Sequence, residues 1–188
     1  RKNGYGYRTN RRLRNVAMKV CIVGKAQGWE DAPEQGIIWG ITQLHRRRPV
    51  SRIIDMNDYS DDPGVVGESE CLKDLALEKG IPYIDLENYP LDAVVEFFGT
   101  DYFSNTVDYA IALAIYEGFT EIDLYGVNMA VGSEYEFEKP GVDFWCGVAI
   151  GKGVKVNVHG NRSMIMKTRD GLMYGYGYPQ KYWGALWK

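Results

Sequence analysis

The 188-residue chain has little of what marks secreted or membrane proteins. It has three cysteines, Cys21, Cys71 and Cys146, and no two of them have C-x-x-C spacing. Each lies in or beside an apolar segment, so we expect reduced core residues rather than disulfides. The sequence has no run of about 18 apolar residues, and its basic start is not followed by the apolar stretch of a secretion signal. These absences predict a cytoplasmic protein without a membrane partner.

Motifs for metal and phosphate chemistry are also absent. The two histidines, His45 and His159, are far apart and have no Cys or His partner at ligand spacing, so we expect no metal site. Gly24 followed by Gly28 is not a GxGxxG fingerprint, and GKG at 151–153 lacks the spacing of a P-loop. A ligand site must therefore be inferred from where polar residues gather.

The net charge of -3 conceals a split along the chain. Residues 1–17 contain six basic residues and no acidic one, so the remainder is acidic. A basic arm could contact nucleic acid or an acidic partner, but the acidic remainder disfavours nucleic-acid binding. MKV at 18–20 resembles a natural start, so the arm could equally be an upstream extension. We expect an extension over 1–17, one domain over 18–170 and an aromatic tail over 171–188.

Short β-branched runs alternate with helical stretches along the central part of the chain. This pattern predicts a single Rossmann-like α/β domain, with a mostly parallel sheet and helices on both faces. The expected strands are 20–24, 52–56, 81–86, 121–127 and 154–159, and the expected helices are 68–79, 91–97, 104–115 and 141–151. The segment 36–41 could be a strand with a short helix behind it, or the whole could be one helix.

The segment 104–130 has polar residues at both functional ends of one αβ unit. Ser104, Asn105 and Thr106 are good helix-start residues, and Gly118 suits a left-handed helix stop. The strand 121–127 then opens into Gly126-Val127-Asn128-Met129. Free N–H groups at such a helix start, beside a strand end, predict a place for a phosphate or another anion. The alternative is a simple helix cap, and Asp108 in the first turn would disfavour a bound phosphate.

Right-handed crossovers would bring the carboxyl ends of all strands to one edge of the sheet. Polar residues follow several strands there: Lys25, Gln27, Thr42, Gln43, Asp55, Asn57, Asn128 and His159. Asp55 could instead be a turn former, and His159 a surface or capping residue rather than a general acid or base. His45, in HRRR, is expected on a solvated helix face.

The residues after strand 121–127 form a second chemically interesting stretch. Ser133 to Trp145 would lie over the pocket as a loop or lid, or would be an ordinary connection packed on the core. Tyr135 could stack on a base or donate to a phosphate. Glu134 could bind sugar hydroxyls or act as a base.

EIDLYGVNMA at 121–130 and EYEFEKPGVDFWCGVAIGKGVKV at 134–156 resemble small Rossmann-like proteins encoded by phages and prophages. VCIVGKAQ at 20–27 and IIWGITQL at 37–44 are similar to the start of these proteins, so the likeness covers about residues 18–178. More distantly, the layout is similar to CMP-sugar-using bacterial sialyltransferases and to 6-hydroxymethylpterin diphosphokinase-like proteins.

This resemblance implies a nucleotide site. It carries over to the first loop, the helix start and the strand end, namely Gly24, Gln27, Ser104, Asn105, Thr106, Gly126, Asn128 and Met129. Two positions depart from the phage pattern. Thr42 stands where the pattern has asparagine, and Asn128 stands where it has aspartate.

The leading hypothesis is a nucleotide-sugar-dependent glycosyltransferase of phage origin. His159 and Glu134 are its candidate catalytic residues, and Thr42 and Tyr135 complete the predicted ligand set. The ligand would be a nucleotide or nucleotide sugar, with no certain cofactor. Two alternatives stay open: a non-catalytic phage protein that sequesters a nucleotide-derived molecule, and an assembly protein. The second would form a homo-oligomer through the Gly-Tyr repeats at 4–7 and 174–178.

Overall fold

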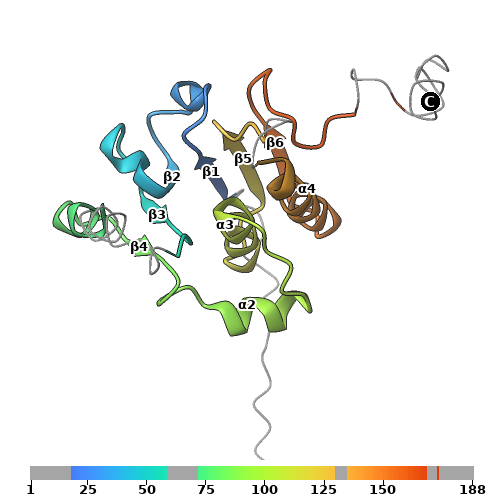
Figure 1. The fold of residues 1–188 in the computed structure, drawn as a ribbon, viewed down its shortest axis with the longest axis horizontal. Helices are drawn as coiled ribbons and strands as arrows, with labels where there is room; N and C mark the ends of the chain where they lie inside the picture. The colour runs from blue at the N-terminus through green and yellow to red at the C-terminus, as the bar shows by residue number, and fades with distance from the viewer. Residues whose placement is uncertain (1–17, 59–71, 130–134, 169–172, 174–188) are drawn as a thin grey trace, which may run out of the picture.

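The computed structural model describes residues 18–58, 72–129, 135–168 and 173 (Figure 1). The basic segment 1–17 and nearly all of the aromatic tail lie outside these ranges. The strands are β1 (Lys19–Val23), β2 (Ile37–Ile41), β3 (Arg52–Ile54), β4 (Tyr83–Ile84), β5 (Glu121–Tyr125) and β6 (Lys155–Val158). The helices are η1 (Trp29–Asp31), η2 (Thr42–Arg46), α2 (Leu91–Phe98), α3 (Thr106–Tyr116) and α4 (Tyr135–Gly151), and residues 72–78 are also helical.

All six strands form one parallel sheet in the order β4-β3-β2-β1-β5-β6. Strands β2, β3 and β4 are added one after another on one side of β1. The chain then returns through α2 and α3 and places β5 on the other side of β1 (Figure 1). The predicted parallel α/β fold is confirmed. The change of direction between β1 and β5 is the point where such sheets open a crevice at their carboxyl edge.

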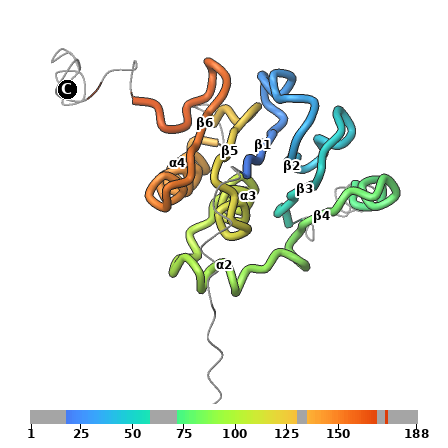
Figure 2. The backbone as a smooth tube through the Cα atoms, turned by 180° about the vertical axis from the view of Figure 1, so that it is seen from behind, coloured from blue at the N-terminus to red at the C-terminus, as the bar shows by residue number. Residues whose placement is uncertain are grey.

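The main core lies between the sheet and the helices α2, α3 and α4, which cover one face (Figures 1 and 2). Alternate residues of the central strands point into it, and Val20, Ile22, Ile122 and Leu124 are completely buried. Helix α3 is buried along most of its length, which explains why the sequence is apolar from Ala110 to Ile115.

The opposite face of the sheet has smaller apolar clusters. Cys21 and Val23 of β1 pack with Leu44 of η2, and Ala76 of the helix at 72–78 packs against β3 and β4. On β5 and β6, this face also carries the charged side chains of Glu121, Asp123 and Lys155. None of the described helices is long and apolar enough to cross a membrane.

The structure shortens one expected strand and decides one alternative that the sequence left open. The strand expected at 81–86 is limited to Tyr83 and Ile84 because a turn begins at Asp85, whose Oδ1 accepts a hydrogen bond from the Glu87 N–H at 3.1 Å. The segment 36–46 forms a strand and then a 3-10 helix, which decides between the two alternatives.

The prediction of a solvated helix face at His45 is wrong. The 3-10 helix η2 folds back onto the sheet and buries His45, which is 4% exposed. This burial lowers the pKa of His45, because the charged imidazole loses its hydration there.

Candidate ligand-binding site

A cavity of about 710 Å³ opens at the carboxyl edge of the sheet, beside the loops that follow β1 and β5. Its walls come from residues that are distant in the sequence. They are 24–26 after β1, 41–42 after β2, 56–58 after β3, 103–107 and 109 at the start of α3, 126–129 after β5, and 135 and 138 in α4. This volume is within the range of pockets that bind small molecules.

The floor of the cavity is a close contact between two backbone segments. The N–H of Gly24 donates to the Tyr125 carbonyl oxygen at 2.8 Å, and the N–H of Ala26 donates to the Gly126 carbonyl oxygen at 3.0 Å. A Cβ atom at Gly24 would collide with the Gly126 carbonyl oxygen, and one at Gly126 would lie 2.8 Å from the Ala26 carbonyl oxygen. Both positions therefore need glycine to let the loops after β1 and β5 meet.

Two polar side chains in the cavity wall lack partners. Thr42 is 7% exposed, and its Oγ1 has no hydrogen-bond partner among the residues that the structure describes. The same is true of the buried Oδ1 of Asn128. A buried polar atom without a partner costs about 1–3 kcal/mol, so such atoms indicate where a ligand or water supplies the missing bond.

The backbone is strained at the same wall. Thr42 has a φ of 52° and Met129 a φ of 47°. A left-handed conformation is unfavourable for residues with a side chain, above all for a β-branched one, and costs on the order of 1–3 kcal/mol. Strain of this kind gathers at ligand sites, where the surrounding structure holds it in place.

A self-contained polar network occupies the start of α3. Asn105 Oδ1 accepts hydrogen bonds from the N–H groups of Val107 at 2.8 Å and Asp108 at 3.2 Å. Asp108 Oδ2 accepts from both the N–H and the Oγ of Ser104, each at 2.8 Å. Asn105 Nδ2 reaches the Glu138 carbonyl oxygen at 3.2 Å, which ties α3 to the first turns of α4.

This network occupies N–H groups at the start of α3. We expected free N–H groups that could hold a phosphate, but the N–H groups of Ser104, Val107 and Asp108 already donate to side chains of the network. Asp108 is completely buried. Burial raises the pKa of Asp108 to about 6, and hydrogen bonds from Ser104 and Asn105 offset only part of this effect. Three N–H groups that could have held an anion at this helix start are therefore already used, and the anion site there stays a prediction.

The aromatic side of the cavity comes from α3, the segment just before it, and α4. The rings of Phe103 and Tyr109 stack with their centroids 4.1 Å apart. Tyr135, 41% exposed, lines the cavity from the first residue of α4. The predicted lid loop is wrong for 135–140, because these residues are the first turns of α4.

Close packing explains why the helix continues through Pro140. A Cβ atom at Gly141 would collide with Ser104 Oγ and Asp108 Oδ2, so the glycine lets α4 lie directly against the start of α3. This contact outweighs the helix-breaking tendency of Pro140 and Gly141. Glu134, the proposed base, lies outside the described residues.

Most of the predicted ligand residues line the same cavity: Gly24, Thr42, Ser104, Asn105, Thr106, Gly126, Asn128, Met129 and Tyr135. Gln27 does not, because it lines a separate cavity of about 330 Å³ with Gly160 and Arg162. Lys25 lines the main cavity but was not in the predicted ligand set. Its place directly after β1 and Gly24 was the sequence signal for it.

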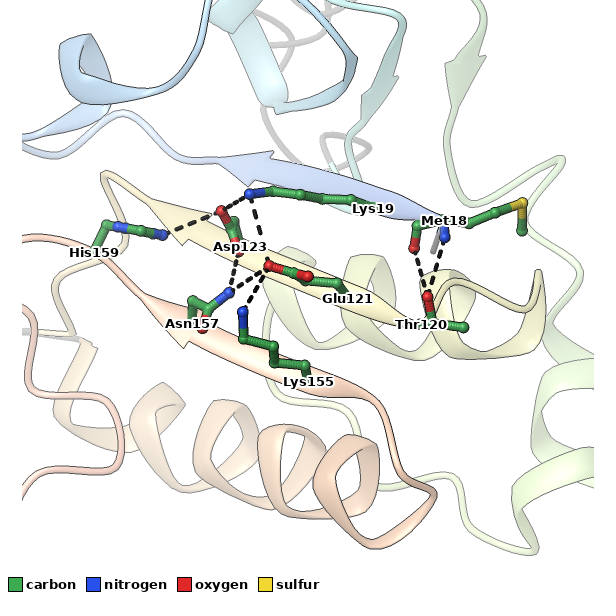
Figure 3. A network of polar contacts seen from close by, with 8 residues as sticks. All are labelled: Met18, Lys19, Thr120, Glu121, Asp123, Lys155, Asn157 and His159. Carbon is green, nitrogen blue, oxygen red and sulfur yellow. Dashed lines mark hydrogen bonds and ion pairs between the residues drawn. The ribbon is translucent and has the colours of Figure 1, made fainter. Parts of the chain in front are cut away.

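His159 is not among the residues that line the cavity, and it lies on the opposite face of the sheet. Its ring stacks on Tyr125, with centroids 4.1 Å apart. Its Nε2 lies 3.2 Å from Asp123 Oδ2 (Figure 3). Asp123 is 1% exposed and also contacts Lys19 Nζ at 2.6 Å and Asn157 Nδ2 at 2.6 Å. Burial alone raises the pKa of Asp123, but hydrogen bonds from Asn157 and Lys19 outweigh it and lower the pKa. Asp123 thus joins β1, β5 and β6.

Comparisons with known proteins give no family for this chain. No protein-family model matches it, and no curated protein matches it. Among solved structures, the sialyltransferase CstII from Campylobacter jejuni, in complex with CMP-3FNeuAc, is 11% identical with a TM-score of 0.40 and covers 78% of this chain and 83% of its own.

A probable thiamine pyrophosphokinase from Staphylococcus saprophyticus is 12% identical with a TM-score of 0.41. The match covers 75% of this chain and 64% of that protein. Likeness at this distance concerns the fold alone, so only the residues of the cavity bear on the ligand.

Proposed function

We propose that the chain binds a nucleotide-like molecule in the cavity at the carboxyl edge of the sheet. The observation that carries this proposal is the pair of unpartnered buried atoms, Thr42 Oγ1 and Asn128 Oδ1, in a cavity wall that is also strained at Thr42 and Met129. These two atoms favour a ligand with several hydrogen-bonding groups. The aromatic rings of Phe103, Tyr109 and Tyr135, which also line the cavity, suit a flat or apolar part of the ligand, and a nucleoside has both parts.

Each group has a chemical role in this proposal. The hydroxyl of Thr42 can both donate and accept, and the amide of Asn128 can do the same, so they suit the edge of a base or the hydroxyls of a sugar. The exposed ring of Tyr135 offers a surface for base stacking. A site built on such bonds rejects ligands that leave its polar atoms unpaired.

We further propose that the bound nucleotide is a sugar donor and that the protein is a glycosyltransferase. Support for this finer step comes from the sequence resemblance. Transfer from a nucleotide sugar depends mainly on positioning and on stabilising the leaving phosphate, which polar side chains can do without a covalent nucleophile. Glu134 is the proposed base, since His159 lies on the other face of the sheet.

Calorimetric titration with the four common nucleoside monophosphates tests the binding step. We expect Thr42→Val, which keeps the shape and removes the hydroxyl, to weaken binding about tenfold. Thr120→Val is the matched control, because Thr120 is exposed and its Oγ1 contacts Met18 near the start of β5, away from the cavity. Absence of binding by every nucleotide, or an equal effect of the two variants, would contradict the proposal.

A panel of nucleotide sugars, followed by release of the nucleotide, tests the transfer step. The second candidate function is a binding protein without turnover. It is favoured by the position of His159 away from the cavity. Tight nucleotide binding without release from any donor would support this second function.

A further inference from the structure

The charges around the cavity are distributed unevenly. Among the lining residues that the structure describes, the charged ones are Lys25, Asp58 and Glu138. The carboxyl group of Asp108 lies directly behind Ser104, which itself lines the cavity. Acidic groups therefore belong to the walls formed by β3, α3 and α4, whereas the cation belongs to the wall formed by β1.

The start of α3 cannot easily accept a phosphate. Its N–H groups at Val107 and Asp108 are taken by Asn105, and the N–H of Ser104 is taken by Asp108. A phosphate placed there would gain few donors and would face a buried carboxyl group. Attraction by the positive helix end is worth only about 0.3–1 kcal/mol at an exposed site, and Asp108 already uses it.

The wall after β1 offers a different environment. The N–H groups of Gly24 and Ala26 donate to the carbonyl oxygens of Tyr125 and Gly126, so the charge of Lys25 is the main attraction for an anion. Lys25 is exposed, and its side chain is thus able to reorient toward a bound ligand. Lysine binds phosphate as a flexible point charge and needs no preformed geometry.

We propose that Lys25 gives the cavity its preference for phosphate-bearing ligands and fixes their orientation. The phosphate lies at the end of β1, and the uncharged part of the ligand lies toward the start of α3, where the polar groups of Ser104 and Asn105 are already paired with one another and with Asp108. This inference rests on the proposed nucleotide binding and adds which end of the ligand each wall receives.

Matched ligand pairs test the role of Lys25. Cytidine, uridine, adenosine and guanosine are titrated beside their 5′-methyl phosphates, whose single negative charge stays constant between pH 5 and 8. We expect Lys25→Gln to weaken binding of the methyl phosphates about tenfold and binding of the free nucleosides less than about twofold. Lys152→Gln is the matched control, because Lys152 is exposed just after the end of α4, away from the cavity. Equal losses for both members of each pair, or equal effects of the two variants, would overturn the proposal.

The pH dependence of the unmodified protein distinguishes the two walls. If the phosphate lies at Lys25, the affinity ratio of methyl phosphate to nucleoside stays nearly constant from pH 5.5 to 8. If it lies at the start of α3, the ratio rises as pH falls and Asp108 becomes neutral, which would overturn the proposal. Failure of every ligand to bind would contradict the proposed function itself, whereas binding of both members without a Lys25 effect would contradict only the orientation.

Discussion

The buried carboxyl group of Asp108 predicts a specific dependence of stability on pH. Its side chain is fully buried between Ser104 and Asn105, and its pKa is raised from 3.8 to about 6 in the folded protein. Between these two values the folded state holds the proton more tightly than the unfolded state does. The stability that Asp108 contributes is therefore fully present below pH 3.8 and is lost as pH rises through about 6.

The magnitude follows from the size of the shift. One pKa unit corresponds to about 1.4 kcal/mol, so the full linkage is about 3 kcal/mol, and the part that falls between pH 4 and pH 7 is about 2 kcal/mol. Many other carboxyl groups titrate in this range. Asp108→Asn removes only this titration, so the difference in free energy of unfolding between the two proteins isolates it.

Urea unfolding of both proteins at half-unit steps from pH 4 to pH 7 measures this difference. We expect the unfolding free energy of the unmodified protein to fall by about 2 kcal/mol relative to Asp108→Asn across the range. The main part of the change should lie between pH 4 and pH 6. Two curves that stay parallel within about 0.5 kcal/mol would refute the interpretation of Asp108 as a destabilised buried acid.

Two further changes test the packing of the sheet and its helices. Gly141→Ala should destabilise the protein by about 2–3 kcal/mol, since the new methyl group collides with Ser104, as urea unfolding will measure. Gly147 lies in the same helix, and a Cβ atom added there would meet no atom of another part of the protein within 4 Å, so Gly147→Ala should stabilise the protein by about 0.5–1 kcal/mol. A change in unfolding free energy of the same sign for both variants would contradict the close contact at Gly141. Asp123→Ala should cost about 3 kcal/mol by the same assay, because it removes a buried acceptor shared by β1 and β6; a loss below about 1 kcal/mol would show that the ion pairs contribute little.

The sequence predicted the parallel α/β fold because hydrophobic periodicity and turn residues are local signals. Runs such as VCIVG and EIDLYGV are buried in a parallel sheet, and Gly118 has the left-handed conformation that was expected, with a φ of 87°. The edge on which the polar residues gather follows from crossover handedness, which is general to parallel sheets. These features need no knowledge of the tertiary contacts.

Other features depend on contacts that local patterns do not contain. The start of α4 before Pro140 depends on its packing against Ser104 and Asp108. The loss of free donors at α3 depends on the orientation of the Asn105 side chain. Because side chains alternate along a strand, Asn157 and His159 could be assigned to the same face of the sheet from the sequence. The sequence alone did not say which face α4 covers.

The position of β1 in the middle of the sheet has a consequence for synthesis of the chain on the ribosome. Its neighbour β2 follows soon after it, but its other neighbour β5 pairs near Met18 and Thr120, which are 102 residues apart. Until β5 has left the exit tunnel, one side of the central strand has no partner, and such unpaired edges attract other chains. The nascent protein therefore acquires the second partner of β1 and the floor of the cavity in the same late step. The cavity is complete only when the risk of aggregation at β1 ends.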